Sequence, residues 1–384
     1  MVKPLFPEAE YRGRVARLQA SMAEHGLDAL LLTTAPDIFY VTGFLTRFWE
    51  SPARPWFLVV PAAGDPVAVI PAIGAELMGK SWLQTCLTWD APFPGDDGVT
   101  LLSETLADLL SATARIGVPM GLETHLRMPL ADFDRVRQAI QPRVFVDGTD
   151  ALQRVREIKT EAEIAKISTS CAVADRAFAR VPEIAHPGVP LNDVFRRFQM
   201  LLLEEGADWV SYLAGASDQA GYGDVISPAT SAPLAPGDVL MLDTGAVKDG
   251  YFCDFNRNFA VGPISAAAAK VQAALWDVTS DVLDLLRPGM LACEVHRAIA
   301  TGLDRRGVKM CGGRQGHGLG LTLTEWPSFT PHDTTELREG MVLTIEPSAF
   351  TSHGKALVHE ENFVLRHDGP KLLSSRAPKT MITL

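Results

Sequence analysis

The sequence predicts two domains: a small α/β domain over residues 1–153 and an α+β domain over residues 154–384, whose helices pack on one face of an antiparallel sheet. The chain has 384 residues, more than a single hydrophobic core usually organises. In the first part, strand-like apolar runs alternate with helical periodicity, whereas later residues place helices before a set of hairpins. This change in spacing falls between Gly148 and Lys159, where we expect the boundary.

The smaller domain begins with a predicted helix at Tyr11–His25, whose apolar residues share one face. Gly26 permits the left-handed backbone that commonly ends a helix. The segments LDALLLTT, PDIFYVTGF and PWFLVVPAAGDPVAVI then alternate strands with helices, and the turn residues AAGDP predict a hairpin. These elements are typical of a small α/β domain.

The larger domain is predicted to contain helices at residues 160–181, 191–205, 265–286 and 291–306. Strand-like segments accompany these helices: VLMLDTGAV, YFCDFNRNFAV, MVLTIEPSAF and ALVHEENFVL. Helices that precede and separate hairpins, rather than alternating with single strands, favour an α+β arrangement.

The composition indicates a globular protein and argues against several functional classes. Hydrophobic residues make up 47% of the chain and charged residues 21%, and the net charge of -11 opposes binding to nucleic acid. The start of the chain has no signal-peptide pattern, and no run of about 18 apolar residues occurs, so we expect neither secretion nor a membrane. Cysteines without a CxxC pair favour reduced thiols in the cytoplasm: Cys86, Cys171, Cys253, Cys293 and Cys311.

An acidic hairpin is predicted in DVLMLDTGAVKDGYFCDFNRNF. If the chain reverses between Lys248 and Asp249, Asp243 pairs with Asp254 across the two strands, with their Cβ atoms roughly 4.5–5.5 Å apart. A bulge at Gly250 would shift this register by one residue. The expected arrangement thus places two aspartates opposite each other.

A second acidic hairpin is predicted in TIEPSAFTSHGKALVHEENF. A turn at His353 and Gly354 pairs Glu346 with Glu361. Side chains alternate between the two faces of a strand, so the neighbouring Glu360 would point to the opposite face. The predicted register therefore selects Glu361 rather than Glu360.

Like charges opposite each other cost up to about 1 kcal/mol when exposed and more when buried, so both pairs need compensation. Divalent cations supply it, because they prefer carboxylate oxygens and accept an imidazole. The candidate imidazole is His317, in GRQGHGLGL. Two cations at such a site activate water for attack on an amide carbonyl, with Glu346 and His317 as catalytic residues and Glu346 relaying the proton. The predicted ligands are Asp243, Asp254, His317, Glu346 and Glu361.

With their neighbours, these residues resemble the motifs of the creatinase/prolidase family of "pita-bread" metallopeptidases, which includes methionine aminopeptidase, aminopeptidase P and Xaa-Pro dipeptidase. LDTGAVKDGYFCDFNR, GHGLGL, GMVLTIEP and VHEENFVL match its ligand-bearing segments. RLQASMAEHGLDALLLTTAPDIFYVTGF is similar to the opening of its N-terminal domain, and REIKTEAEIAKI to the start of its catalytic domain. The resemblance implies a creatinase-type N-terminal domain, a pita-bread catalytic domain and two divalent metal ions.

The resemblance also implies a homodimer, in which each N-terminal domain helps to close the active site of the other subunit. This would bring the aromatic residues Phe48 and Trp49 to the substrate, although they could instead pack in a core. The implied substrate is a short peptide or another small molecule. Manganese is the first candidate metal, and iron, cobalt and zinc remain open.

Departures from the family pattern concentrate around the substrate. TEWP stands where peptidases of the family carry His-Glu-x-Pro, so that Thr324 replaces a histidine, and a hydroxyl cannot carry a proton near neutral pH as imidazole does. A second expected histidine is absent from GYGDVISPATSAPLAPGD. The candidate substrate contacts are Thr324, Trp326 and Tyr222.

Smaller departures lie beside the predicted ligands. Asn256 and Asn258 replace threonines that flank the family's arginine, here Arg257, and His359 replaces an arginine. An amide can still orient a carboxylate by hydrogen bonding, so metal binding is compatible with these changes. We expect Asn256, Arg257 and His359 to support the ligands.

Three functions follow from this pattern. The first is a metal-dependent hydrolase of a peptide or other amide bond, most similar to an Xaa-Pro dipeptidase or aminopeptidase. The missing histidines motivate a second, a small-metabolite enzyme of the same fold that resembles ectoine hydrolase or dimethylsulfoniopropionate lyase. The third is a binding module without activity, which the complete ligand set disfavours.

Overall fold

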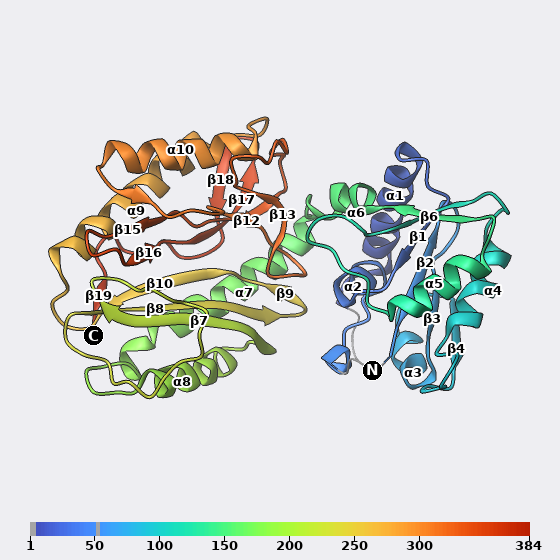
Figure 1. The fold of residues 1–384 in the computed structure, drawn as a ribbon, viewed down its shortest axis with the longest axis horizontal. Coiled ribbons are helices and arrows are strands. Elements are labelled where there is room, and N and C mark those ends of the chain that lie inside the picture. The colour runs from blue at the N-terminus through green and yellow to red at the C-terminus, as the bar shows by residue number, and fades with distance from the viewer. Residues whose placement is uncertain (1–4, 51–53) are drawn as a thin grey trace. The chain divides into compact units, whose positions relative to one another are not determined.

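The structure, a computed structural model, describes residues 5–50 and 54–384 (Figure 1). The chain divides into two compact units, Met1–Arg156 and Glu157–Leu384. Within the described part of the chain, no helix combines the length and the apolar character that crossing a membrane requires.

The first unit is an α/β unit whose mixed sheet has the strand order β4-β3-β2-β1-β5-β6. Its strands are β1 (Ala29–Leu32), β2 (Phe57–Pro61), β3 (Val67–Pro71), β4 (Thr85–Trp89), β5 (Arg115–Val118) and β6 (Val144–Asp147). Its helices are α1 (Glu8–Glu24), α2 (Ala35–Thr42), α3 (Ala75–Met78), α4 (Val99–Leu109), α5 (Leu130–Ala139) and α6 (Thr149–Arg156). Every residue of β1, β2 and β3 is buried, so both faces of the sheet are covered at its centre.

The sequence predictions for this unit are confirmed. Helix α1 covers most of the predicted segment Tyr11–His25, and Gly26 adopts a φ of 64° just beyond it. Strands β2 and β3 pair antiparallel on either side of the predicted turn AAGDP. Local patterns therefore sufficed to place these elements.

The second unit contains the remaining elements. Its helices are α7 (Glu161–Ala179), α8 (Leu191–Glu204), α9 (Ala266–Leu285) and α10 (Ala292–Arg305). One sheet has the order β19-β10-β8-β7, with β9 paired to β8; a second has the order β13-β12-β14-β17-β18, and a third β11-β15-β16. Their strands are β7 (Trp209–Gln219), β8 (Asp238–Lys248), β9 (Tyr251–Phe252), β10 (Phe255–Ala260), β11 (Lys309–Met310), β12 (His317–Gly318), β13 (Glu325–Ser328), β14 (Val342–Ile345), β15 (Ser348–Phe350), β16 (Ala356–Val358), β17 (Glu361–Arg366), β18 (Gly369–Leu372) and β19 (Ile382–Thr383).

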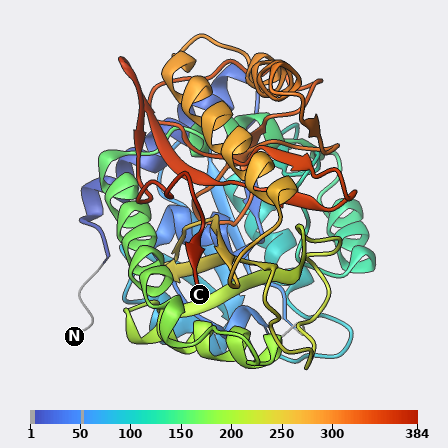
Figure 2. The same ribbon diagram turned by 90° about the vertical axis from the view of Figure 1, so that its left-hand side faces the viewer.

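The helices of this unit enclose the sheets from two sides rather than one. Helices α7 and α8, green in the figures, pack against β8 and β7, whereas α9 and α10, in orange, cover β16, β18 and β11 (Figure 1, Figure 2). Thr160 starts α7 with a capping box, in which its hydroxyl accepts from the backbone N–H of Glu163 and the Glu163 carboxylate accepts in return. The expected α+β architecture is thus confirmed, with helices on both outer faces.

The register of the first acidic hairpin differs from the prediction. Lys248 pairs with Tyr251, and Asp249 and Gly250 both adopt positive φ, as a two-residue hairpin turn requires. The turn is therefore centred one residue later than expected. Asp243 consequently pairs with Asn256 rather than with Asp254.

The second acidic hairpin is shifted as well. Ser348 pairs with Val358 and Ile345 with Glu361, so the turn is centred on His353, and Gly354 takes the left-handed position with φ 72°. Continuing this register, Glu346 lies opposite Glu360 instead of Glu361. A shift of one residue exchanges the two faces of a strand, which makes it decisive for the site.

Candidate metal centre

Three buried side chains from separate segments converge in the second unit. One ligand atom each from Asp254, His317 and Glu360 lies within 4.8 Å of the others. His317 Nε2 is 3.3 Å from Asp254 Oδ2. Asp254 lies between β9 and β10, His317 begins β12, and Glu360 directly precedes β17.

Asp243 and Glu346 complete the acidic cluster. Burial raises the pKa of Asp243 well above its usual range, and the charge of Asp254 adds to the effect. Burial, helped by the charges of Asp254 and Asp243 and opposed by His317, raises the pKa of Glu346 to about 7. Burial, then Asp254, Asp243 and Glu346, raises the pKa of Glu360. These carboxylates therefore share one site and repel one another when charged.

The imidazole of His317 is oriented for metal binding. Its Nδ1 lies 2.8 Å from the carbonyl oxygen of Gly318. A carbonyl oxygen only accepts hydrogen bonds, so Nδ1 carries the proton and the lone pair of Nε2 faces Asp254. This tautomer is the one that a metal ligand with a backbone acceptor adopts.

Two carboxylate oxygens of the cluster make no hydrogen bond to the described residues. Asp243 Oδ1 and Glu360 Oε1 are both inaccessible to solvent. A buried acceptor left without a partner costs about 1–3 kcal/mol, and more when it is charged. Divalent cations would satisfy these oxygens, and a set of carboxylates with one imidazole is a suitable donor set for them. The residues thus fit the implied metal ions.

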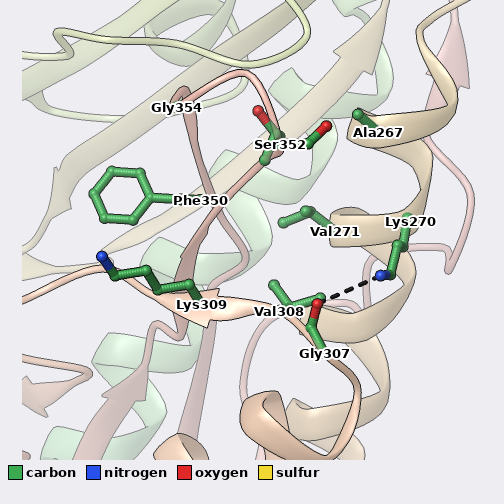
Figure 3. A pocket seen from close by; sticks show the side chains of 10 residues that line it. Ala267, Lys270, Val271, Gly307, Val308, Lys309, Phe350, Ser352 and Gly354 are labelled. Atoms are coloured by element: carbon green, nitrogen blue, oxygen red, sulfur yellow. Dashed lines mark hydrogen bonds between the residues drawn. The ribbon is translucent and has the colours of Figure 1, made fainter.

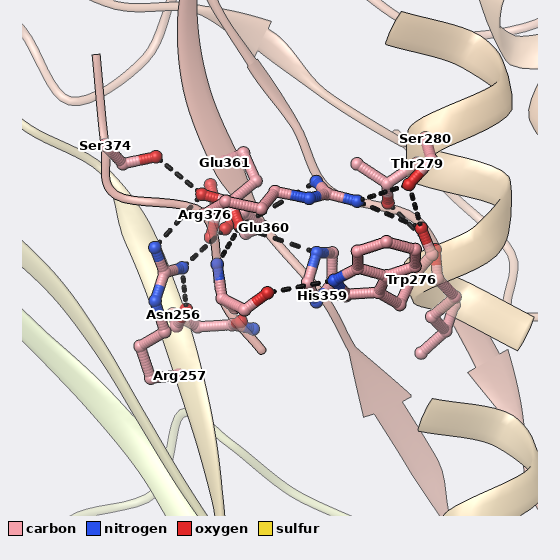
Figure 4. Close-up of polar contacts among 12 residues, drawn as sticks. Asn256, Arg257, Trp276, Thr279, Ser280, His359, Glu360, Glu361, Ser374 and Arg376 are labelled. Atoms are coloured by element: carbon pink, nitrogen blue, oxygen red, sulfur yellow. Dashed lines mark hydrogen bonds and ion pairs between the residues drawn. The ribbon is translucent and has the colours of Figure 1, made fainter. Parts of the chain in front are cut away.

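The structure does not bring Glu361 into this cluster. Its Oε2 accepts hydrogen bonds from Arg257 Nη2 at 3.0 Å and Ser374 Oγ at 2.6 Å, and its Oε1 accepts from the backbone N–H of Ala377 at 2.8 Å (Figure 4). The shifted hairpin register is the physical reason, because it sends Glu361 to the face opposite Glu360. Glu361 therefore lies outside the cluster, and Glu360 occupies the place that was predicted for it.

Arg257 joins the two acidic hairpins behind the cluster, as expected for a supporting residue. Its Nη1 donates to the carbonyl oxygens of Asn256, at 2.7 Å, and Glu360, at 2.8 Å. Its guanidinium lies 4.5 Å from the ring centre of Phe255. The Arg257 side chain thereby fixes the backbone at Glu360, directly before β17, while it also pairs with the Glu361 carboxylate.

His359, the other predicted supporting residue, lies buried beside Glu361. Its Nε2 is 3.5 Å from Glu361 Oε1. Burial, followed by the charges of Arg376 and Arg257, lowers the pKa of His359 well below its usual range. The imidazole is therefore neutral in the folded protein and borders Glu361 rather than the carboxylate cluster (Figure 4).

Three functional candidates were missed in the sequence. Asn362 accepts from the Asp254 backbone N–H at 2.9 Å and donates to the Asp254 carbonyl, which holds the segment between β9 and β10. Tyr212 lies on β7, next to the strand of Asp243, and its hydroxyl lowers the pKa of Asp243. Arg314 Nε lies 3.6 Å from Glu346 Oε1. The position of Arg314 close before His317 was the one available signal, since the other two meet the site through long-range strand pairing.

The predicted substrate contacts have different surroundings. Tyr222 is only 1% exposed, and its hydroxyl accepts from the Val358 N–H at 2.6 Å and donates to Asn258 Oδ1 at 3.3 Å. A substrate-facing role for Tyr222 is therefore contradicted. Thr324 and Trp326 are partly exposed on and before β13, which pairs with β12 at His317, and their substrate role stays a prediction.

Phe48 and Trp49 belong to a short helical turn, Phe48–Glu50, in the first unit. The Trp49 ring lies 5.3 Å from that of Trp56, and the guanidinium of Arg127 lies 4.9 Å from its centre. Phe48 is 37% exposed. Trp49 thus takes part in local aromatic packing, and the role of both residues at a partner's site stays a prediction.

A separate cavity of about 570 Å³ opens elsewhere in the second unit (Figure 3). Lys270, Lys309 and Phe350 lie on its walls, and Lys270 Nζ donates to the Gly307 carbonyl at 3.4 Å. None of the carboxylates of the cluster lines it. This cavity therefore does not provide the metal site.

Comparisons with known proteins agree with the geometry. The chain is 29% identical over 377 residues to the probable dipeptidase PepE of Mycobacterium tuberculosis, covering 95% of this chain and 94% of that protein. It is 22% identical to the Xaa-Pro dipeptidase of Pyrococcus horikoshii, covering 94% and 96%. The crystal structure of dipeptidase PepE from Mycobacterium ulcerans matches with a TM-score of 0.84 and 26% identity over 98% of this chain and 99% of that one.

Family patterns cover both units. The creatinase/prolidase N-terminal domain matches residues 14–158, and metallopeptidase family M24 matches residues 165–367. The second match spans the segments that carry Asp243, Asp254, His317, Glu346 and Glu360. The resemblance seen in the sequence is confirmed, and the chain belongs to metallopeptidase family M24.

Proposed function

We propose that this protein hydrolyses the peptide bond of dipeptides with two divalent cations held by Asp243, Asp254, His317, Glu346 and Glu360. The observation that carries the proposal is the convergence of these groups, two of which present buried oxygens without a hydrogen-bond partner among the described residues. Membership in family M24 and the named dipeptidase relatives support the same reaction.

The two cations would supply Lewis-acid activation of water and polarisation of the peptide carbonyl. The residues of the chain hold the donor set in place, because Asn362 fixes the Asp254 backbone and the Gly318 carbonyl fixes the His317 tautomer. Glu346 is the residue best suited to carry a proton to the leaving nitrogen. Its side chain is 21% exposed and burial brings its pKa to about 7.

The reaction is tested with protein stripped of metal and then reloaded with manganese, iron, cobalt or zinc. We expect hydrolysis of a panel of dipeptides, including Xaa-Pro dipeptides, only after reloading, and loss of that activity in Glu346→Gln. A reloaded protein that binds metal but cleaves no peptide would contradict the proposal.

A second candidate is hydrolysis of a small amide metabolite, favoured by Thr324 in place of a proton-carrying histidine. Zwitterionic osmolytes cleaved in the absence of any dipeptide turnover would favour this candidate. Restoring the histidine in Thr324→His separates the two, since we expect it to raise dipeptide turnover without affecting metabolite cleavage.

We further propose manganese as the metal, a homodimeric assembly and a cytoplasmic location. Oxygen-rich donor sets suit manganese, although availability also decides occupancy. The free cysteines favour a reducing compartment. Metal analysis of protein purified without added metal, sedimentation of that protein and fractionation of the producing cells test the three proposals.

A further inference from the structure

The loop of residues 319–324 connects β12 to β13 at the edge of the candidate metal centre. It follows β12, whose first residue is the candidate ligand His317. The Gly320 carbonyl accepts from the N–H of Phe252 on β9 at 2.9 Å. Strand β9 belongs to the first acidic hairpin. The loop is therefore joined to segments that hold three of the candidate ligands.

The same loop also presents side chains to solvent. Thr322, Leu323 and Thr324 are each partly exposed. Leu323 packs on Gly245 of β8, the strand of Asp243, so closely that a Cβ at Gly245 would lie 2.4 Å from the Leu323 Cδ1. The loop thus combines contact with a ligand-bearing strand and side chains that a bound molecule can reach.

The carboxylate of Glu325, the first residue of β13, holds this loop from inside the fold. Its Oε1 accepts from the backbone N–H groups of Leu321, at 2.9 Å, and Thr322, at 3.3 Å. A Cβ at Gly320 would lie only 3.0 Å from both carboxylate oxygens, so the backbone of the loop passes directly beside the carboxylate. Hydrogen bonds to an ionised acceptor are stronger than those between neutral groups. Glu325 therefore anchors the conformation of the loop.

Lys159 compensates the charge of this carboxylate. Its Nζ lies 3.0 Å from Glu325 Oε2, and both side chains are only 2% exposed. The backbone N–H of Lys159 donates to the Gly340 carbonyl at 3.0 Å, which fixes the lysine in turn. Replacing a buried ion pair by apolar side chains of similar volume is often neutral or stabilising. The hydrogen bonds that Glu325 accepts from the loop therefore explain the pair better than stability does.

We propose that Glu325, with its charge compensated by Lys159, positions the loop of residues 319–324 as a wall of the substrate site. This inference rests on the proposed function and adds a positioning residue to it. Glu325 acts through the backbone of the loop, so its loss should weaken substrate binding more than it slows the chemical step.

Two double variants separate this role from a contribution to stability. Lys159→Met/Glu325→Gln removes both charges but keeps a carbonyl oxygen as an acceptor for the loop. Lys159→Met/Glu325→Leu removes the charges and the acceptor together. Neither variant leaves one partner of the ion pair buried alone, so we expect both to fold.

The kinetics of the two double variants are compared on metal-loaded protein. In Lys159→Met/Glu325→Leu we expect KM for a dipeptide to rise by about 10-fold, as the loss of one or two hydrogen bonds allows. The kcat and the number of bound ions should stay close to those of the wild type. In Lys159→Met/Glu325→Gln we expect KM within about 3-fold of the wild type. Equal KM in the two variants, or loss of bound metal from Lys159→Met/Glu325→Leu alone, would overturn the inference.

Arg338→Gln serves as the matched control. Arg338 pairs with the buried carboxylate of Glu157, which lies close to Lys159 in the sequence, and neither residue belongs to the loop. We expect this variant to leave KM unchanged. A rise in KM equal to that of Lys159→Met/Glu325→Leu would show that any ion pair in this region affects the site, and would refute the specific role of Glu325.

Hydrogen exchange of the Leu321 and Thr322 N–H groups, followed by NMR, tests the anchoring without any substrate. Slow exchange in the wild type and in Lys159→Met/Glu325→Gln, with fast exchange in Lys159→Met/Glu325→Leu, supports it. Fast exchange in the wild type, or equally slow exchange in both variants, refutes it. Absence of peptide cleavage alone refutes only the proposed function.

Discussion

Two adjacent glutamates at the start of β17 have opposite surroundings. Glu360 faces the carboxylates of Asp243, Asp254 and Glu346, and its Oε1 has no hydrogen-bond partner among the described residues. Glu361 is buried to the same degree, but both of its oxygens accept hydrogen bonds, one of them from Arg257. Burial alone therefore does not distinguish a ligand from a structural carboxylate.

The difference lies in what compensates each charge. The carboxylate of Glu361 is compensated within the chain, so it can hold the strand in place without any added ion. The charges that act most strongly on Glu360, those of Asp254, Asp243 and Glu346, have the same sign as its own, so a cation bound from outside would compensate it. Of these two neighbouring residues, Glu360 thereby belongs to the candidate site and Glu361 stabilises the fold.

The largest effect on stability is expected from removing the internal compensation of Glu361. Arg257→Met removes the nearer of two guanidinium groups from that carboxylate and leaves only Arg376, whose Nη1 lies 3.8 Å from Glu361 Oε1. We expect the free energy of unfolding to fall by about 3 kcal/mol in urea denaturation, the lower end of the range for breaking a buried ion pair. Replacing both Arg257 and Glu361 by Met should recover part of this loss. The exposed pair of Arg366 with Glu161 is the control, where Arg366→Met should cost about 1 kcal/mol or less. An equal loss of free energy of unfolding in Arg257→Met and Arg366→Met would contradict the idea that Glu361 depends on a compensating cation within the chain.

The second-largest effect on stability is expected from adding metal, and this stabilisation should be larger at high pH than at low pH. Burial raises the pKa of Glu346 from 4.5 to about 7. Between pH 4.5 and about 7, Glu346 therefore holds a proton more often in the folded metal-free protein than in the unfolded chain. The folded protein consequently loses stability as the pH rises through this range. Cations replace those protons. At pH 8, with free metal at about 100 times its Kd, we expect the free energy of unfolding to increase by about 2.7 kcal/mol. Most of this increase should disappear at pH 5. Thermal unfolding showing the same gain at both pH values would contradict this.

A smaller effect is expected from Asn362, which holds the ligand segment rather than a metal. Asn362→Ala removes both hydrogen bonds to the Asp254 backbone, and we expect metal affinity to fall by about 10- to 100-fold. Asn362→Asp keeps an acceptor for the Asp254 N–H but loses the donor to the Asp254 carbonyl. Its metal affinity should therefore lie between those of the wild type and Asn362→Ala. Competition with a metal-sensitive dye measures both, and unchanged affinity in Asn362→Ala would show that Asp254 needs no such support.

The smallest effect is expected at Tyr212, whose hydroxyl contacts Asp243. Tyr212→Phe removes the hydroxyl that favours the charged form of Asp243, while Asp243 can still bind a cation. We expect a loss of about 1 kcal/mol in metal binding, within the range for a single hydrogen bond. A loss as large as that of a ligand variant would mean that Tyr212 orients Asp243 in an essential way.

The helices and four of the five side chains of the acidic cluster could be predicted from the sequence because they depend on local patterns. The periodicity of residues 160–181 and the turn residues between β2 and β3 are both short-range signals. The register of the strand pairs could not be predicted from such short-range signals. The second hairpin can turn on His353 or between His353 and Gly354, depending on the backbone conformation at Gly354. This choice decides whether Glu360 or Glu361 faces the acidic cluster.

Two supporting residues, Asn362 and Tyr212, were harder to predict than Arg257, because no local pattern connects them to the acidic cluster. Asn362 reaches Asp254 from a strand 108 residues away in the chain. Tyr212 lies on β7, beside the strand of Asp243. Tyr222, in contrast, was assigned to the substrate from its place in the sequence, whereas the fold buries its hydroxyl between Val358 and Asn258. Long-range pairing determined each of these outcomes.

The metal content of two single-residue variants tests the central claim most directly. Glu360→Gln and Glu361→Gln differ by one position and keep side-chain size, so folding can be matched by circular dichroism before the metal is counted. If about two ions bind per wild-type chain, Glu360→Gln should lose about one of them, and Glu361→Gln should retain both. Retention of both ions in Glu360→Gln with loss from Glu361→Gln would contradict the assignment.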